Sequence, residues 1–421
     1  PAVKWTCDSR SESHGAATAS QTPTCDEADG PQYERLYFLD HDVQKGFLTE
    51  CVEELIALKN QYRGTPLYGS TKTVTNSIYG VLGFANADSS FRLFDWRLAE
   101  AITLCGRKMI TYSADYVLDK LSDVGHEDAY VALGDTDGCG IALPSASTRH
   151  DALSTVEDFA ESLNGVGYDK FFSDKMNVSP EHHHGGMEVE SFAPKVFVPS
   201  RNPPHGEVGV KKRRIEWQTW DEDDGEIDDI SITGLEAQRS DVAPITQQAQ
   251  EWFADTLRMD DQAAKEQLYP QLREYVELIR SGEIATERIC KRGGIGQSLY
   301  EYGSSSRRPA PLYRGAKYTN EYIDGETIQQ GDKPFAIYVD SVGTQLPATY
   351  SATTAEGGDM VDTISVTNAE NVPDGVTIDY EKHLTKVLIE PMKPLLATRF
   401  GRDPWSEIIH QHEQGALENF M

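Results

Sequence analysis

The 421-residue sequence lacks long hydrophobic runs and paired cysteines. No run of 18 or more apolar residues occurs, and the first 30 residues lack the apolar stretch of a signal peptide, so we expect a soluble, cytoplasmic protein. The six cysteines are scattered without CxxC pairs, which argues against a disulfide framework and against a zinc site. The thiols are therefore expected to be free in a reducing compartment.

Basic side chains are also scarce, with 39 Lys and Arg against 68 Asp and Glu. This balance normally argues against a nucleic-acid partner, because phosphate binding uses a basic surface. An acidic, lysine-poor surface also keeps a protein soluble in molar salt, where the Debye length falls to about 3 Å. Only local basic clusters are then informative, and these are Lys211 to Arg214, Lys291 with Arg292, and Arg307 with Arg308.

The apolar material, 38% of the residues, is sufficient for two or three domains with real cores. In "GFLTECVEELIALKNQYR" (46–63) apolar residues recur at helical spacing, and Gly64 and Pro66 separate this helix from a second one through "STKTVTNSIYGVLGF". The two segments predict a helical hairpin.

The remaining elements are expected from periodicity and turn residues. Helices are predicted at about 97–121 and 154–163, twice between 241 and 282, and at about 380–400. Strands are predicted in "GMEVESFAPKVFVPS", in "EVGVKKRRIEW" before the acidic turn "DEDDGEIDD", and in "KPFAIYVDSV". Structure is expected to begin near Leu36 after a polar loop, and residues 344–375 are predicted to form a polar surface insertion.

The stretch "ALGDTDGCGIAL" places two acids between short apolar runs. Its flanks favour strands and its "GDTDG" favours a turn, so we predict a β-hairpin with Asp135 and Asp137 at the tip. Turn statistics favour solvated acids at such a tip. The alternative is a site for Mg²⁺, which takes few carboxylates together with substrate phosphate oxygens. An EF-hand fits poorly, because Cys139 and Ala146 would fall at ligand positions.

A second motif, "KTVTNSIYG", lies on the second predicted helix. Lys72, Asn76 and Tyr79 are spaced i, i+4, i+7 and therefore share one face, and Gly80 allows close approach at its end. This face offers a cation, an amide and an aromatic ring. The alternative is a surface lysine whose apolar stem covers the helix.

These motifs carry a family resemblance. "KTVTNSIYG" resembles the KxxxNSxYG motif of family B DNA polymerases, and "LGDTDG" resembles their YGDTDS motif, in the same order and at similar spacing. "GFLTECVEELIALKNQYR" is similar to the first fingers helix, "MEVES" to a palm strand with a further carboxylate, and "VGVKKRR" to the KKRY element that contacts duplex DNA. "ITGLEAQRSDVAPITQQAQ" and "VTIDYEKHLTKVLIEPMKPLLATRFG" are similar to the opening and the last helix of the thumb. The acidic composition suggests a haloarchaeal or haloviral version.

The resemblance implies an α+β right-hand polymerase fold without N-terminal and exonuclease domains. An antiparallel palm sheet would carry a helical fingers hairpin and a mainly helical thumb. The implied domains are a polar loop with the remnant of a palm insertion (1–44), fingers (45–88), palm (89–215), thumb (216–405) and a tail (406–421).

The implied activity is template-directed DNA synthesis, in which two Mg²⁺ ions about 4 Å apart support addition of deoxynucleoside triphosphates to a primer 3′-end. The resemblance implies that Asp137 binds the metals, that Asp135 is a supporting acid, and that Glu188 or Glu190 is the further carboxylate. Contacts to the incoming nucleotide are implied for Lys59, Arg63, Lys72, Asn76 and Tyr79, with Lys72 at the triphosphate. Backbone contacts to primer–template DNA are implied for Lys211, Lys212, Arg213, Lys291 and Arg292.

The sequence departs from the family in one important respect. The motif DxxSLYPS, which supplies the other essential metal aspartate, is absent. Smaller departures are Leu133 for Tyr, Gly138 for Ser and Arg214 for Tyr. We therefore expect a C-terminal portion of a longer polymerase, inactive alone and completed by an N-terminal segment that carries the motif. The alternative is a non-catalytic relic that binds DNA and a sliding clamp.

Two further features of the sequence lie outside these motifs. "QGALENFM" resembles a clamp-interacting peptide, which implies that Gln414, Leu417, Phe420 and Met421 bind a sliding clamp and that the protein is nucleoid-associated; the alternative is a frayed terminus. The consecutive histidines at 182–184 are expected to form a surface loop, because neighbouring residues do not easily converge on one metal ion.

Overall fold

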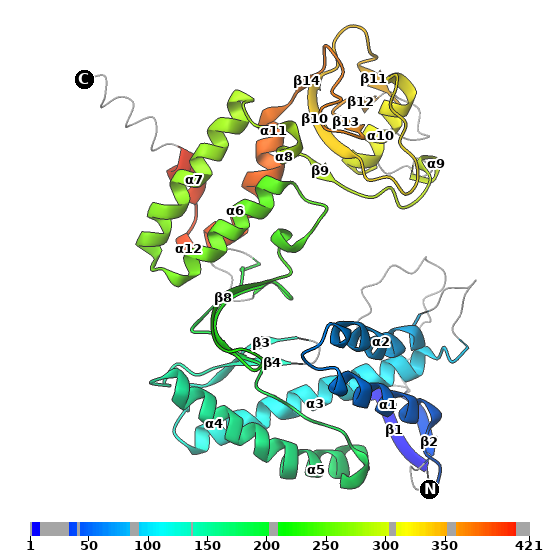
Figure 1. Ribbon diagram of the computed structural model, residues 1–421, viewed down its shortest axis with the longest axis vertical. Helices are drawn as coiled ribbons and strands as arrows, with labels where there is room; N and C mark the ends of the chain where they lie inside the picture. The colour runs from blue at the N-terminus through cyan, green and yellow to red at the C-terminus, as the bar shows by residue number, and fades with distance from the viewer. Residues whose placement is uncertain are drawn as a thin grey trace, which may run out of the picture. The chain divides into compact units, whose positions relative to one another are not determined.

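The computed structural model describes residues 43–84, 92–135, 138–201, 209–302, 309–351 and 359–409, together with the backbone of strands β1 (Ala2–Asp8) and β2 (Tyr33–Leu39). The chain divides into unit 1, Pro1–Glu190, and unit 2, Ser191–Met421, which are drawn in Figure 1. In these ranges no helix has the length and apolar character needed to cross a membrane.

Unit 1 combines helices with two separate two-stranded sheets. Its further elements are α1 (Phe47–Gln61), α2 (Leu67–Leu82), α3 (Trp96–Asp123), β3 (Tyr130–Gly134), β4 (Cys139–Ala142), α4 (Arg149–Ser162), a π turn (Leu163–Gly167), α5 (Tyr168–Phe171), a second π turn (Phe172–Met176) and a 3-10 turn (Pro180–His182). The predicted helical hairpin, the long helix and the β-hairpin are confirmed as α1 with α2, α3, and β3 with β4.

Two expectations for unit 1 were wrong. The helix predicted from 154 begins at Arg149, because the Thr148 hydroxyl caps it by accepting a hydrogen bond of 3.1 Å from the backbone N–H of Asp151. Structure does not begin near Leu36, since β1 pairs antiparallel with β2 from Ala2 opposite Leu39 to Asp8 opposite Tyr33. A local pattern does not reveal a partner so far along the chain.

The core of unit 1 lies between α3, α5 and the β3–β4 hairpin. Val117 and Leu121 of α3 and Tyr168 and Phe171 of α5 are buried together, and Ile141 of β4 packs against them. The Ser113 hydroxyl and the Tyr168 hydroxyl are 2.7 Å apart inside this core, which satisfies both buried groups. The hairpin is therefore anchored to a rigid helical base.

Unit 2 has two four-stranded antiparallel sheets and a group of helices. In the first sheet β7 (Arg214–Asp221) pairs with β5 (Ser191–Phe192), β6 (Lys195–Phe197) and β8 (Gly225–Thr233). In the second, β10 (Phe335–Ser341) pairs with β9 (Lys291–Arg292), β13 (Thr363–Val366) and β14 (Thr377–Ile378), and β11 (Thr349–Tyr350) pairs with β12 (Asp359–Met360). The helices are α6 (Pro244–Asp255), α7 (Asp261–Ser281), α8 (Thr286–Ile289), α9 (Leu299–Tyr302), α10 (Pro311–Tyr322), α11 (Tyr380–Leu384) and α12 (Glu390–Phe400), with a π turn (Thr385–Ile389) and 3-10 turns (Glu236–Gln238, Thr256–Arg258).

One hydrophobic core joins the sheets and helices of unit 2. It contains Phe253 of α6, Leu272 of α7, Ile337 of β10 and Ile364 of β13, each at most 1% exposed. The segment from α11 to α12 supplies a large share of its centre, with Leu384, Val387, Leu388, Met392, Leu395 and Leu396 almost completely buried. The predicted helices between 241 and 282 and near 380–400 and the strand at "KPFAIYVDSV" are confirmed.

Three expectations for unit 2 and its border were wrong. Residues 344–375 are not simply a surface insertion, because β13 is buried along its whole length and pairs with β10. Met187 to Glu190 of "GMEVES" lie outside any strand, and β5 begins only at Ser191. In "DEDDGEIDD" the turn covers residues 222–224 alone, because β8 already begins at Gly225, whose φ of 76° suits a glycine.

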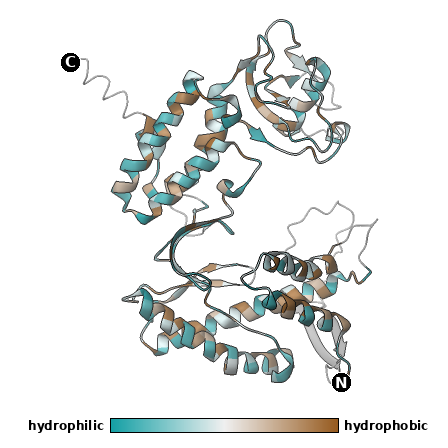
Figure 2. Cartoon of the chain, in the orientation of Figure 1, coloured by the Kyte–Doolittle hydropathy of each residue, from teal (hydrophilic) through white to brown (hydrophobic). Residues whose placement is uncertain are grey.

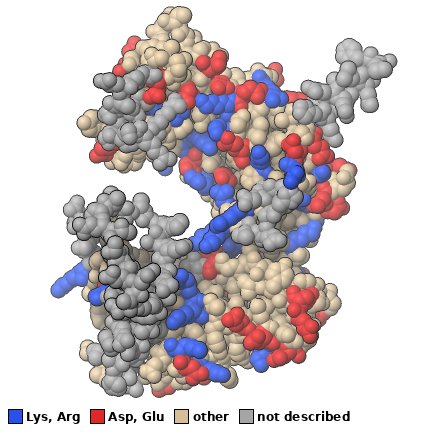
Figure 3. Space-filling model, turned by 180° about the vertical axis from the view of Figure 1, so that it is seen from behind, with Lys and Arg blue, Asp and Glu red and all other residues tan. Residues whose placement is uncertain are grey.

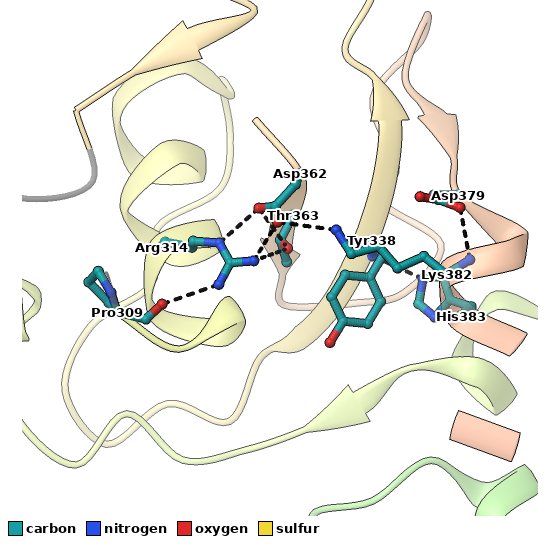
Figure 4. Close-up of polar contacts among 8 residues, drawn as sticks. All are labelled: Pro309, Arg314, Tyr338, Asp362, Thr363, Asp379, Lys382 and His383. Atoms are coloured by element: carbon teal, nitrogen blue, oxygen red, sulfur yellow. Dashed lines mark hydrogen bonds and ion pairs between the residues drawn. The ribbon is translucent and has the colours of Figure 1, made fainter. Parts of the chain in front are cut away.

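His383 is a fully buried polar link between α11, β10 and the segment before β9. The backbone N–H of Tyr338 donates to its Nε2 over 2.9 Å (Figure 4). The neutral ring therefore carries its proton on Nδ1 and donates to the Ile289 carbonyl over 2.9 Å. Burial lowers the pKa of His383 from 6.5 to about 4, against the opposing effects of the Ile289 carbonyl and Asp379.

Unit 2 is therefore expected to lose stability in mild acid. Between pH 6.5 and pH 4 the unfolded chain binds a proton at His383 that the folded chain does not, so the free energy of unfolding should fall by about 3 kcal/mol as the pH decreases. Denaturant unfolding at pH 7 and pH 4.5 measures this loss. His383→Gln, which does not titrate, should show a much smaller loss, and equal losses in both proteins would contradict the assignment.

Candidate functional site

The β3–β4 hairpin has the geometry that the sequence predicts. Gly134 is opposite Cys139, and the Asp135 N–H donates to the Gly138 carbonyl over 2.9 Å, which closes the tip. Asp135 is half-buried at the end of β3. Thr136 and the predicted metal carboxylate Asp137 lie outside the described residues.

The hairpin is closed at its base, and its two strands lie close together in the middle. At its base, the Ser145 hydroxyl donates to Asp128 over 2.7 Å and lies 2.8 Å from Nδ1 of His126, which joins the residues before β3 to those after β4. In the middle, Gly140 allows the two strands to approach, since a Cβ there would lie 3.2 Å from the Leu133 side chain. A hairpin closed in this way is suited to fixing a functional group in space.

The α1–α2 hairpin carries the predicted nucleotide-contacting residues. Lys72, Asn76 and Tyr79 lie on α2 and are all exposed, and the ammonium of Lys72 lies 5.9 Å from the centre of the Tyr68 ring. On the partner helix, Lys59 lies in the last turn of α1 and is half-buried, and Arg63 follows the helix and is exposed. The two helices pack side by side, so their basic groups belong to one small body.

The predicted carboxylates after α5 are exposed, and they are not placed on a strand. Glu188 and Glu190 lie in the irregular segment that ends unit 1. Two of the preceding histidines have separate hydrogen-bond partners. His183 Nε2 lies 2.9 Å from Asp169 while its ring stacks on Phe172, and His184 Nε2 lies 3.2 Å from Glu53 of α1.

Metal ligands are not brought together in the part of the chain that the structure describes. There, no group of three or more His, Cys, Asp or Glu side chains is arranged to hold an ion. Asp135, Glu188 and Glu190 are not part of such a group.

The predicted DNA-binding residues of unit 2 lie at two places. Lys211 and Lys212 are exposed in a turn immediately before β7, and Arg213 is half-buried beside them, 3.6 Å from Glu236. Lys291 and Arg292 form the exposed strand β9, where the Arg292 guanidinium lies 5.0 Å from the centre of the Phe335 ring. Figure 3 shows acidic and basic side chains interspersed on one face of unit 2. The basic groups of this face therefore attract phosphates only at short range.

The predicted clamp-binding residues Gln414, Leu417, Phe420 and Met421 lie outside the described residues, as does most of the polar N-terminal region. Sequence reasoning missed Gly234 and Glu236, which contact the basic turn before β7. The sequence holds only part of the information needed to find them. A glycine at the end of a strand indicates a special backbone position, but the sequence does not show which residue this glycine contacts.

Comparison with known proteins gives a family match within unit 1. Residues 69–177 match the sequence model of DNA polymerase family B. This range contains most of α2, all of α3, the β3–β4 hairpin and α4, and with them Lys72, Asn76, Tyr79, Asp135 and Asp137. The DNA polymerase delta catalytic subunit of Oryza sativa subsp. japonica is 30% identical over 142 residues, which cover 31% of this chain and 13% of that protein. The chain thus matches a small part of a much longer relative. Between residues 69 and 177 it is therefore similar to a region of DNA polymerase family B.

Proposed function

We propose that this chain takes part in template-directed DNA synthesis, adding deoxynucleoside triphosphates to a primer 3′-end. The observation that carries the proposal is the pairing of two motifs in one matched region: the closed hairpin with "GDTDG" at its tip and the exposed Lys72, Asn76 and Tyr79 on one face of α2. An acid at a fixed tip suits a hard cation, and a cation on a helix face suits a triphosphate.

Asp137 is the proposed principal metal carboxylate, with Asp135 as its supporting acid and Glu190 or Glu188 as a further one. Two Mg²⁺ ions would supply charge neutralisation at the transferred phosphate. Lys72, with Lys59 and Arg63, would contact the triphosphate, and Asn76 and Tyr79 would line the new base pair. The basic groups at Lys211–Arg213 and Lys291–Arg292 would hold phosphates of primer–template DNA without reading its sequence.

We further propose that a second polypeptide segment completes unit 1 and supplies the missing DxxSLYPS aspartate. Among the described residues, all the exposed large apolar side chains except Val196, Tyr300 and Met360 lie in unit 1, whose helices carry many apolar residues in Figure 2. Tyr130 and Val131 of β3 are 55% and 41% exposed. A two-stranded sheet is marginal alone, and exposed apolar side chains on it support the addition of further structure.

Primer extension in molar KCl with Mg²⁺ tests the proposal directly. The chain alone is compared with the chain plus a segment that carries DxxSLYPS, and duplex binding is followed in parallel by fluorescence anisotropy. We expect extension only in the mixture, because one essential aspartate is missing from the chain. The tail is tested in the same assay by adding a sliding clamp, which should increase product length only when residues 414–421 are present.

The outcomes separate the alternatives. Extension by the chain alone would show that no second segment is needed. Absence of extension in both samples, with duplex binding intact, would contradict the enzymatic proposal and favour a non-catalytic DNA-binding protein. Loss of both activities would contradict the DNA-binding proposal as well.

A further inference from the structure

The basic turn before β7 has an unusual backbone. Lys212 has a φ of 58°, the left-handed conformation that a residue with a long side chain adopts only when its surroundings impose it. Arg213 and Arg214 follow, and Arg214 is already paired with Thr233 of β8. The turn that presents Lys211 and Lys212 is thus the end of the β7–β8 ladder.

Gly234 lies directly against this turn. A Cβ on Gly234 would be 1.8 Å from the Lys212 carbonyl oxygen and 2.9 Å from its carbonyl carbon, so any side chain would displace the backbone of Lys212. Gly234 itself has a φ of 67° and is exposed at its outer side. The absence of a side chain at Gly234 therefore allows the backbone of the turn to approach closely, and it does not serve packing in the core.

Glu236 ties the turn to helix α6. Its carboxylate lies 3.6 Å from the Arg213 guanidinium and accepts a hydrogen bond of 2.8 Å from the side-chain amide of Gln250. Gln250 is fully buried on α6, and its carbonyl oxygen accepts a hydrogen bond of 2.8 Å from the Ala237 N–H. The segment from Gly234 to Ala237 is thus fixed at both ends, at the basic turn and at a buried amide.

We propose that Gly234 is a positioning residue for DNA binding, which allows the Lys211–Arg213 turn to hold two lysines toward the phosphates of the duplex. The inference rests on the proposed function, because it assigns a role to one of its DNA contacts. A turn held in one conformation places its charges without the cost of ordering them on binding. Gly234 would act without touching DNA.

Gly234→Ala and Gly225→Ala form a matched pair that tests this inference. Both glycines border β8 and have positive φ, but a Cβ on Gly225 meets nothing within 4 Å.

Duplex affinity is measured by anisotropy at several KCl concentrations with the full chain. We expect Gly234→Ala to weaken binding about tenfold and to reduce the slope of log K against log salt by about 1 to 2, because two phosphate contacts are misplaced. Gly225→Ala should stay within about twofold of the wild type, since it only adds backbone strain.

The salt slope distinguishes positioning from simple loss of stability, which would not change the number of phosphate contacts. Adding Gly234→Ala to the double variant Lys211→Ala, Lys212→Ala should produce no further change in slope. Equal behaviour of Gly234→Ala and Gly225→Ala would overturn the inference. Failure of the wild type to bind duplex would instead contradict the proposed function.

A second pair of variants, at Lys212, leaves Gly234 unchanged. This pair tests the same inference if Gly234→Ala does not fold. Lys212→Gly and Lys212→Val remove the same charge, but glycine accepts a φ of 58° and a β-branched side chain resists it. We expect Lys212→Val to bind the duplex severalfold more weakly than Lys212→Gly. Equal affinities would show that the conformation of the turn does not matter for binding.

Discussion

Replacing Asp137 by Asn is expected to reduce nucleotide addition by at least about 10³-fold, equivalent to about 4 kcal/mol of transition-state stabilisation. The amide has nearly the same shape but cannot supply the negative charge that holds a hard cation. Single-turnover primer extension, with the chain and the motif-bearing segment together, measures the rate. Duplex binding should remain within about twofold of the wild type, because phosphate contacts lie elsewhere.

Asp123→Asn is the matched control for this variant. The Asp123 carboxylate, at the end of α3, is 72% exposed and lies 3.8 Å from Lys120. The substitution therefore removes the same charge from the same unit, at a residue that has no proposed role. Extension by Asp137→Asn at the wild-type rate would refute the metal assignment. Equal losses in the two variants would point to a general charge effect.

Replacing Arg314 by Met is expected to destabilise unit 2 by about 3 to 5 kcal/mol, because it leaves a largely buried carboxylate without its main partner. Arg314 is 7% exposed and binds Asp362 with two hydrogen bonds, of 2.8 Å from Nε and 2.6 Å from Nη2 (Figure 4). Burial alone would raise the pKa of Asp362, but Arg314 and Lys382 together lower it to about 2. Lys382 lies 3.1 Å from the same carboxylate and compensates only in part.

The chain contains a nearly identical pair at its surface, which serves as the control. Arg239 binds Asp241 through the same two atoms at 2.8 Å and 2.6 Å, but the two side chains are 57% and 48% exposed. Arg239→Met should therefore cost at most about 1 kcal/mol. Denaturant unfolding followed by tryptophan fluorescence compares the two variants. Similar losses in both would show that burial does not set the strength of the Arg314 pair.

The parts of the fold that the sequence predicts well are those with local signals. The α1–α2 hairpin follows from helical periodicity with a Gly and Pro break, and the β3–β4 hairpin from apolar runs around turn residues. Strand β13 was missed because its residues, Thr363–Val366, stand in a polar stretch and become a strand through pairing with β10. Such pairing depends on distant residues, which override local propensity.

The same distinction applies to the candidate site. Spacing on a helix predicts that Lys72, Asn76 and Tyr79 share a face, and they are exposed together on α2. The contact between Gly234 and the Lys212 carbonyl could not be predicted, because it depends on the register of β7 with β8 and on a backbone angle. Glu190 was expected on a strand from its alternating neighbours, but the strand begins after it.

The burial of the segment from α11 to α12 determines when unit 2 can fold during synthesis. Its apolar side chains fill the centre of a core whose other walls, α6, α7 and β10, come earlier in the chain. Those walls leave the ribosome with their apolar faces uncovered and stay so until the segment that ends at Phe400 has emerged as well. Because contacts between such distant segments form slowly, the nascent unit passes through an exposed, aggregation-prone interval. A chaperone or rapid completion of the chain would shorten it.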